Sequence, residues 1–359
     1  MMRLTPTLNQ SPKDAIAPIR VMLVDDSMTA RSIFSRVLGD YPGIEIVCEA
    51  ADSDCAVAYL DDVYVDIILL DIEMPKRSGL EALPDILAKA KGARVLVVSA
   101  FAEENGPAAV LALSLGACDT LAKPGRGGFS GRFTQTLIDK VMRLGRSARN
   151  RGEGVCDPPQ GPDYEVSVKP RCIAIGSSTG GIPAIHYLLR SLEPALDCPI
   201  FITQHLPDAF MTFFARQLGG LSARIVKVGE VGERVANNHV YIAPGHAHLV
   251  CRRERDDVII DHQAHYTSSR YCPSVDAMME SIARAYRRDC LGIILSGMGN
   301  DGLAGATAFA DVAAPVLVQD MQSSVVWGMP GAVAKAGLAA SISTPAQMAT
   351  MLSRAANTL

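Results

Sequence analysis

The sequence has no C-x-x-C pair, no long apolar run and no excess of positive charge. Its nine cysteines are scattered and odd in number, which is typical of reduced, mostly buried thiols. No stretch approaches the roughly 20 apolar residues of a membrane span, and residues 1–18 lack the apolar core of a signal peptide. A net charge of −4 gives no reason to expect a nucleic-acid footprint. We therefore expect a cytoplasmic protein without membrane insertion or nucleic-acid binding.

The length and composition indicate two globular domains. A chain of 359 residues can form two cores, and 48% hydrophobic with 20% charged residues is a globular composition. A short helical segment is expected over 129–144, and it is followed by residues rich in Arg, Gly and Pro. Such a segment has too little apolar surface for a packed core. We expect domains over 19–143 and 170–356, joined by a linker over 144–169.

The first domain alternates strand-like and helical segments about five times. This pattern predicts an α/β domain with a doubly wound, flavodoxin-like sheet of five parallel strands. The strand-like runs are Ile19–Val24, Ile44–Ala50, Asp66–Leu70, Ala93–Val98 and Cys118–Leu121.

Polar residues collect where these strands end. Asp25 and Asp26 follow the first strand, Asp71 the third, Ser99 the fourth and Lys123 the fifth. Carboxyl ends of parallel strands meet at one edge, where crowded carboxylates need a cation, and Mg²⁺ suits such an oxygen set. A carboxylate can accept a phosphoryl group, and a lysine and a hydroxyl can bind its oxygens. We expect Asp71 to be the nucleophile, with Ser99 and Lys123 as the phosphoryl-binding residues.

Residues 19 to about 143 resemble the receiver domain of two-component response regulators. The matching residues are Asp25-Asp26, Leu70-Asp71-Ile72-Glu73-Met74-Pro75, Gly79, Ser99-Ala100 and Lys123-Pro124. The resemblance implies that Asp71 is the phosphoacceptor of a histidine kinase. It also implies that the backbone carbonyl of Glu73 joins Asp26 and Asp71, beside Asp25, in holding Mg²⁺. Receivers usually carry an aromatic switch residue three positions before the lysine, where this chain has Thr120, so we expect phosphorylation without that switch.

The second domain returns to alternating strands and helices. We expect an α/β domain with a mostly parallel sheet, in which the stretch from about 223 to 261 forms a β-hairpin insertion. The strand-like runs are Arg171–Gly176, Pro199–Gln204, Ala223–Val228, His239–Ala243, Leu249–Arg252, Val258–Asp261, Cys290–Leu295 and Ala314–Gln319.

Three of these strands end in residues that acyl transfer requires. The first ends in Ser177-Ser178, the second in His205, and a later one in a Gly-rich turn that contains Asp301. A serine needs an imidazole to take its proton, and a carboxylate must fix the imidazole tautomer. Since the carboxyl ends of parallel strands share an edge, we expect these groups to meet there. Backbone amides of the Gly297-Met298-Gly299 turn could form the oxyanion hole.

Several assignments have competitors. Ser178 lies at the tip of its turn, with Ser177 and Thr179 as neighbours, and Asp276, at a helix start, competes with Asp301. His246-x-His248 has the alternation of metal ligands, although no third ligand is evident. The Gly-rich turn over 176–181 could also be a phosphate cradle, but no acidic ribose-binding residue follows at the required distance. A domain that binds a partner without catalysis is the other alternative.

Residues from about 170 to 356 resemble the catalytic domain of the chemotaxis methylesterase family CheB. The matching stretches are Ile175-Gly176-Ser177-Ser178-Thr179-Gly180-Gly181, Thr203-Gln204-His205-Leu206-Pro207, Val240-Tyr241-Ile242-Ala243-Pro244-Gly245, Pro273-Ser274-Val275-Asp276, Ser296-Gly297-Met298-Gly299-Asn300-Asp301-Gly302 and Gly328-Met329-Pro330. The resemblance implies a triad of Ser178, His205 and Asp301, with the Met298 amide as oxyanion donor and no cofactor in this domain. It also implies demethylation, and glutamine deamidation, of methyl-accepting chemotaxis receptors under the control of a chemotaxis histidine kinase.

Overall fold

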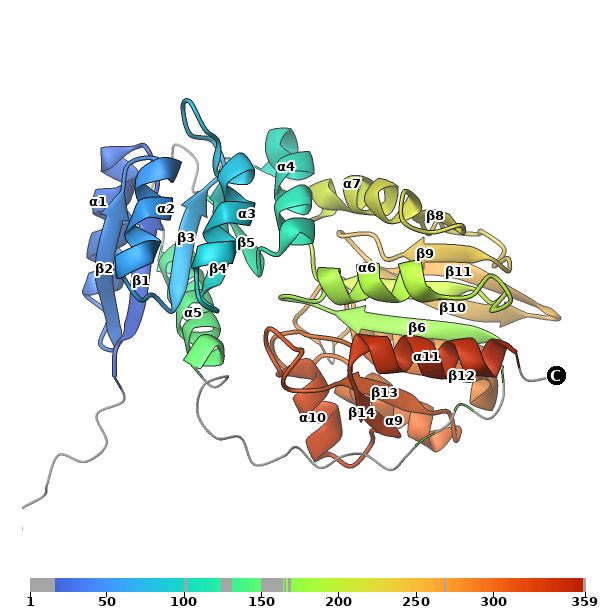
Figure 1. Cartoon of the computed structure of the whole chain (residues 1–359). Coiled ribbons are helices and arrows are strands. Elements are labelled where there is room, and N and C mark those ends of the chain that lie inside the picture. The colour runs from blue at the N-terminus through green and yellow to red at the C-terminus, as the bar shows by residue number, and fades with distance from the viewer. Residues whose placement is uncertain are drawn as a thin grey trace, which may run out of the picture.

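The computed structural model describes residues 17–99, 102–123, 131–149, 164, 166, 169–267 and 269–357. These residues form two α/β domains that lie side by side (Figure 1). No helix among them is both long and apolar enough to cross a bilayer. The expected linker over 144–169 lies largely outside the described residues.

The first domain is a doubly wound parallel sheet, as the sequence predicts. Its strand order is β2-β1-β3-β4-β5, and every neighbouring pair is parallel. Alternate strand residues pack against α1 and α5 on one face and against α2, α3 and α4 on the other. The elements are β1 (Ile19–Val24), α1 (Met28–Gly39), β2 (Ile44–Ala50), α2 (Ser53–Asp62), β3 (Ile67–Asp71), α3 (Gly79–Lys89), β4 (Arg94–Ser99), α4 (Ala102–Leu115), β5 (Asp119–Ala122) and α5 (Gly131–Arg149).

Helix α5 continues to Arg149, beyond the end expected at residue 144. Arg149 Nη2 lies 2.5 Å from Asp66 Oδ2, which is fully buried at the start of the sheet. This ion pair fixes the last turn, and basic side chains are favourable at a helix C-terminus. The sequence pattern missed this extension because the stabilising partner is distant in the chain.

The second domain contains a seven-stranded sheet in the order β14-β13-β12-β6-β7-β9-β8, with all pairs parallel. The expected hairpin insertion is narrower than the stretch 223–261. Strands β8 and β9 join the main sheet, and only β10 and β11 form a separate antiparallel hairpin. Strand β14, at the sheet edge, was not predicted, because three residues are too few for a periodic signal.

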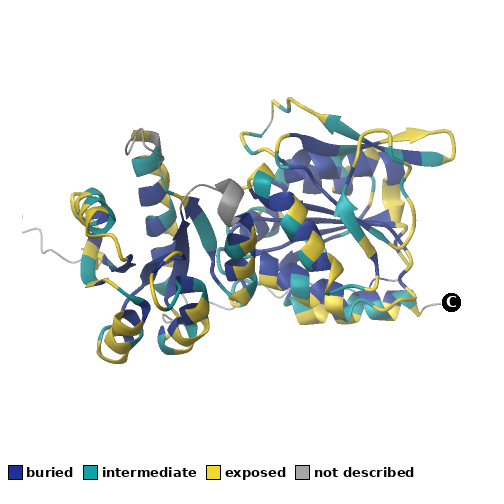
Figure 2. Cartoon of the chain, turned by 90° about the horizontal axis from the view of Figure 1, so that it is seen from above, coloured by how far each residue is buried: buried dark blue, intermediate teal, exposed yellow. Residues whose placement is uncertain are grey.

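The strands of this domain are buried on both faces. Helices α6, α7 and α11 cover one face, while α8, α9, α10 and the hairpin cover the other. Figure 2 shows the strands mostly in dark blue, with exposed residues on the outer surfaces of the helices. The elements are β6 (Cys172–Ser177), α6 (Ile182–Ser191), β7 (Ile200–Gln204), α7 (Asp208–Gly219), β8 (Ile225–Val228), β9 (His239–Ile242), β10 (His248–Glu254), β11 (Asp257–Gln263), α8 (Val275–Tyr286), β12 (Cys290–Ile294), α9 (Leu303–Asp311), β13 (Val316–Gln319), α10 (Met329–Lys335), β14 (Ser341–Ser343) and α11 (Pro345–Ala356), with a 3₁₀ turn over Arg287–Asp289.

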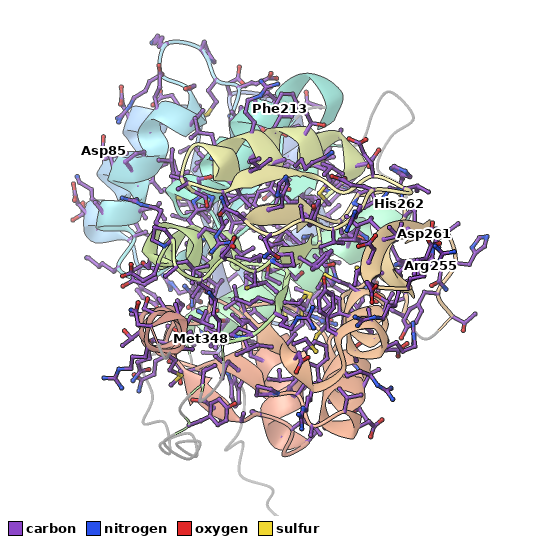
Figure 3. The ribbon with its side chains drawn as sticks, turned by 90° about the vertical axis from the view of Figure 1, so that its right-hand side faces the viewer. Asp85, Phe213, Arg255, Asp261, His262 and Met348 are labelled. Carbon is purple, nitrogen blue, oxygen red and sulfur yellow. The ribbon has the colours of Figure 1, made fainter. Side chains whose placement is uncertain are left out.

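The two domains share an apolar interface. Helix α4 of the first domain packs against α6 and α7 of the second, and one continuous cluster of buried residues includes side chains from both domains. Phe213 of α7, labelled in Figure 3, lies against Gly106 of α4, where a Cβ would come within 3.1 Å of the phenyl ring. The domains are therefore packed together directly in this arrangement.

The close packing of β6 against α8 gives a stability prediction. A Cβ at Gly176 would lie 2.3 Å from Val275 Cγ1, so we expect Gly176→Ala to lower the free energy of unfolding by about 1–3 kcal/mol. The change in the free energy of unfolding is measured by urea denaturation, in which the fluorescence of Trp327, the single tryptophan, reports on the second domain. Gly219→Ala, at the end of α7 in the same domain, is the control, because the nearest atom to its Cβ position is Val226 Cβ at 3.8 Å, an ordinary contact distance. Equal urea midpoints for Gly176→Ala and the wild type would contradict the prediction.

Candidate functional site

Three carboxylates of the first domain meet at the carboxyl edge of its sheet. Oxygens of Asp25, Asp26 and Asp71 all lie within 4.8 Å of one another. Lys123 Nζ lies 2.7 Å from Asp25 Oδ2 and 2.6 Å from Asp71 Oδ2. Ser99 is buried at the end of the neighbouring strand, and its carbonyl accepts the Lys123 amide at 2.7 Å. The structure thus brings together the residues that the sequence placed at this edge.

Burial dominates the electrostatics of this edge. It raises the pKa of Asp71, and the nearby Asp25 adds to the effect, while Lys123 partly opposes it. Burial alone would lower the pKa of Lys123, but its bonds to Asp25 and Asp71 outweigh burial and raise it. Crowded, acceptor-only oxygens of this kind fit a hard divalent cation such as Mg²⁺. Glu73 follows Asp71 closely, and its amide donates to Asp71 Oδ1 at 3.3 Å.

In the second domain, a histidine and an aspartate from distant segments form a hydrogen-bonded pair. His205 directly follows β7, and Asp301 lies in the turn between β12 and α9. His205 Nε2 is 2.8 Å from Asp301 Oδ2. The amide of Val275 also donates to Oδ2, and the Ser274 hydroxyl donates to Oδ1. The first turn of α8 therefore holds the carboxylate that orients the imidazole.

These donors keep Asp301 ionised despite its burial. Burial would raise its pKa, but the bonds from His205, the Val275 amide and Asp276 outweigh burial and lower it. Asp276, the competing acid, does not contact His205. Its Oδ1 accepts the amides of Gly302 and Gly305, both at 2.8 Å, and so fixes the turn that carries Asp301.

Ser178 lies in the turn between β6 and α6, held by backbone contacts to two other strand ends. Its amide donates to the Ser296 carbonyl at 3.0 Å, and its carbonyl accepts Gln204 Nε2 at 2.9 Å. Ser178 and His205 line the same small cavity of about 10 Å³. Within the described residues, Ser178 Oγ makes no hydrogen bond to His205, and His205 Nδ1 is buried without a partner. Catalytic hydrogen bonds often form only when substrate is present.

The turn after β12 supplies a free amide near Ser178. The Gly297 amide donates to the Val326 carbonyl at 3.0 Å, whereas the Met298 amide makes no hydrogen bond among the described residues. Gly297 also lies close to the serine, because a Cβ built there would come within 3.0 Å of Ser178 Cβ. The Met298 amide is thus available for a ligand near Ser178.

Sequence reasoning missed three contacts around this site. The Tyr271 ring stacks on His205, with centroids 4.6 Å apart and planes 12° apart. The Gln204 side chain accepts a hydrogen bond from the Ser177 hydroxyl and donates one to the Ser178 carbonyl. Gln204 could have been noticed because it precedes His205, whereas no local pattern marks a stacking tyrosine. The alternation His246-x-His248 does not form a group of metal ligands among the described residues: His246 Nδ1 bonds Asp208 Oδ1, and His248 Nδ1 accepts the Ser274 amide.

The first domain covers the second-domain site directly. Thr179 Oγ1 donates to Asp119 Oδ2 at 2.6 Å, and the Gly180 amide donates to the Cys118 carbonyl at 2.8 Å. The small cavity that contains Ser178 is closed by residues of α4 and of the start of β5. Ser178 is only 9% exposed in this arrangement.

An acidic pocket of the phosphoacceptor type in one α/β domain, together with a histidine–aspartate pair in a second α/β domain packed against the first, is the arrangement of a response regulator with an enzymatic output domain. Comparisons with known proteins agree. Family models match the chain as a response regulator receiver domain over residues 21–128 and as a CheB methylesterase over residues 173–352. The chain belongs to the CheB methylesterase family.

Relatives and a solved structure extend this match to most of the chain. A protein-glutamate methylesterase/protein-glutamine glutaminase 2 of Caulobacter vibrioides is 37% identical over 335 residues, which cover 90% of this chain and 95% of the relative. A protein-glutamate methylesterase/protein-glutamine glutaminase 1 of Paramagnetospirillum magneticum is 35% identical, with 92% and 94% covered. The crystal structure of the Thermotoga maritima CheB methylesterase catalytic domain matches with a TM-score of 0.50 and 31% identity, covering 52% of this chain and 99% of that chain. The expected fold and enzyme class are confirmed.

The buried Asp276 gives a prediction about pH. Burial, together with the adjacent Asp301, raises the pKa of Asp276 from 3.8 to about 7. A carboxyl group whose pKa is higher in the folded than in the unfolded state makes its full contribution to stability at pH values below its unfolded-state pKa. That contribution is lost as the pH rises through the folded-state pKa. We therefore expect Asp276→Asn to gain stability relative to the wild type between pH 4 and pH 7.

Urea unfolding at several pH values measures this difference. Asp276→Asn keeps the oxygen that accepts the Gly302 and Gly305 amides. Asp256→Asn, in the exposed hairpin turn, removes the same charge without burial and should show no such trend. A constant stability difference for Asp276→Asn across this range would mean that Asp276 does not titrate there.

Proposed function

We propose that the chain is a phosphorylation-regulated serine hydrolase. It demethylates γ-methyl-glutamyl residues of methyl-accepting chemotaxis receptors and deamidates receptor glutamines. The observation that carries the proposal is the hydrogen bond between His205 and Asp301, which forms beside the turn of Ser178. The names of the relatives, protein-glutamate methylesterase/protein-glutamine glutaminase, support the substrate class.

The reaction follows from the orientation of the imidazole. Because Nε2 faces Asp301, Nδ1 is the nitrogen left to take the Ser178 proton. Ser178 Oγ attacks the ester carbonyl carbon, the bond to the methoxy oxygen breaks, and methanol leaves with the proton from His205. Water then attacks the acyl-enzyme, with His205 again as the base, and releases glutamate and free Ser178. A glutamine amide follows the same path, with ammonia as the leaving group.

The negative charge that develops on the carbonyl oxygen needs a donor. The Met298 amide is assigned this role, because it makes no other hydrogen bond among the described residues and lies in the turn against Ser178. A backbone donor of this kind contributes about 3 kcal/mol to transition-state stabilisation. Asp301 stabilises the imidazolium that forms at the same time.

The identity of the nucleophile is tested by a matched pair of serine variants. Ser178→Ala should lower methanol release from methyl-labelled receptor membranes by about 10⁴-fold or more, because no other hydroxyl occupies its position. Ser177→Ala removes a neighbouring hydroxyl that donates to Gln204, and it should retain activity within about tenfold. Loss of activity in Ser177→Ala with retention in Ser178→Ala would reverse the assignment.

The receiver domain regulates the esterase activity of the second domain. In this proposal, a chemotaxis histidine kinase transfers a phosphoryl group to Asp71, and Ser99 and Lys123 bind its oxygens. Asp25, Asp26, Asp71 and the Glu73 carbonyl would hold Mg²⁺, and the bound ion would neutralise charge on the phosphoryl group. The closed cavity over Ser178 then describes the resting state, in which α4 and β5 exclude a receptor helix. Phosphorylation shifts the population toward an arrangement that admits it.

The contact between Asp119 and Thr179 offers a test of this control. Asp119→Ala removes the acceptor of Thr179 Oγ1 and the partner of Lys140 Nζ at 2.5 Å. Since a hydrogen bond to a charged group contributes about 1.5 kcal/mol, basal esterase activity without phosphodonor should rise about tenfold. Asp61→Ala is the matched control, because Asp61 pairs with Lys89 inside the receiver, and it should leave basal activity unchanged. Unchanged activity in Asp119→Ala would count against control by this contact.

A further inference from the structure

A second hollow lies between the two domains and is much larger than the cavity over Ser178. Its volume is about 720 Å³. Helix α5 of the receiver lines one side, and the other side consists of α10 and the loops that follow β12 and β13 (Figure 1). We call it the α5–α10 cleft. The proposed reaction uses none of its side chains.

The charged side chains that line the α5–α10 cleft are all positive. Arg143 and Arg146 project from α5, and Lys335 lies in the last turn of α10. Among the described residues, these three side chains form no ion pair, and no acidic side chain lines the cleft. All three are exposed and stay hydrated, so they are ready to receive an anion. Because they come from both domains, an anionic ligand would contact both.

The cleft also reaches the proposed oxyanion turn. Met298 and Gly299 form part of its wall, and Trp327 provides an aromatic surface beside them. The Trp327 ring is held in place, since its Nε1 donates to the Gln319 carbonyl at 2.8 Å. A polypeptide bound in the cleft would therefore lie next to the turn that is assigned to the reacting ester.

We propose that the α5–α10 cleft docks an acidic segment of the substrate polypeptide. This inference rests on the proposed function, because each demethylation or deamidation leaves a carboxylate on the substrate. A segment with several such sites carries several negative charges, which match the cations of the cleft. The cleft thus holds the substrate through carboxylates that flank the site of reaction. The receiver contributes two of the three cations to this recognition.

The single tryptophan makes the docking measurable without catalysis. Trp327 is the only tryptophan in the chain and lines the cleft, so its fluorescence reports on ligands there. The experiment titrates the full-length Ser178→Ala chain with acetyl-hexaglutamate amide and, separately, with acetyl-hexaglutamine amide. We expect a saturable change with hexaglutamate that weakens as salt is added, and no saturable change with hexaglutamine.

Charge-removing variants assign the effect to the cleft. Arg143→Gln, Arg146→Gln and Lys335→Gln should each weaken hexaglutamate binding about two- to fivefold, which is the range for exposed ion pairs. Arg36→Gln, on the outer helix α1, is the matched control and should bind as the parent does. Absence of binding, equal binding of the two peptides, or equal affinity in all variants would overturn the proposal.

A kinetic measurement links the cleft to the substrate. In the chain with Ser178 intact, the double variant Arg143→Gln/Arg146→Gln should raise KM for methyl-labelled receptor membranes and leave kcat unchanged. Hexaglutamate binding with unaltered KM would overturn substrate docking and leave only a site for another anion. If the wild type released no methanol, the proposed function would fail, while the fluorescence titration would still decide whether the cleft binds acidic peptides.

Discussion

The Asp301 carboxylate is the group on which the arrangement of the second domain depends. It is fully buried, yet it accepts hydrogen bonds from His205, from the Ser274 hydroxyl and from the first amides of α8. A buried carboxylate is tolerable only when donors replace its water, so the position of α8 and the turn of Asp301 are fixed together. Asp276 fixes the same turn from the other side. The imidazole then has one orientation, with Nδ1 left for Ser178.

Close packing of the backbone makes this geometry possible. At the end of β6, Gly176 lies against the Val275 side chain, so that α8 can approach the sheet closely enough to reach Asp301. Gly180 has a φ of +73° and lies against Val325, where any Cβ would come within 2.2 Å. Only glycine combines that backbone conformation with that space. The Gly-rich turn is thus an elbow that presents Ser178, and neither glycine needs a phosphate to explain it.

Much of this could be predicted from the sequence, because the parallel-sheet rule turns distant strand ends into neighbours. The three segments that carry Ser178, His205 and Asp301 were placed at one edge by that rule alone, and the structure has all three there. Other features depend on contacts that no local pattern encodes. The stacking of Tyr271 on His205 and the ion pair that extends α5 to Arg149 join residues far apart in the chain. Propensity and periodicity describe one segment at a time, so they cannot supply such pairs.

Strand β5 joins the two sites physically. Lys123, directly after its carboxyl end, contacts Asp71, while the Cys118 carbonyl, directly before its start, and the Asp119 carboxylate accept hydrogen bonds from the turn next to Ser178. A phosphoryl group on Asp71 would draw Lys123 toward new oxygens and so bias the whole short strand. Thr120 occupies the position of the aromatic switch in other receivers, and it lies on this strand between the two contacts. In the proposed regulation, the strand itself can transmit the change, because both sites bond its backbone or its own side chains.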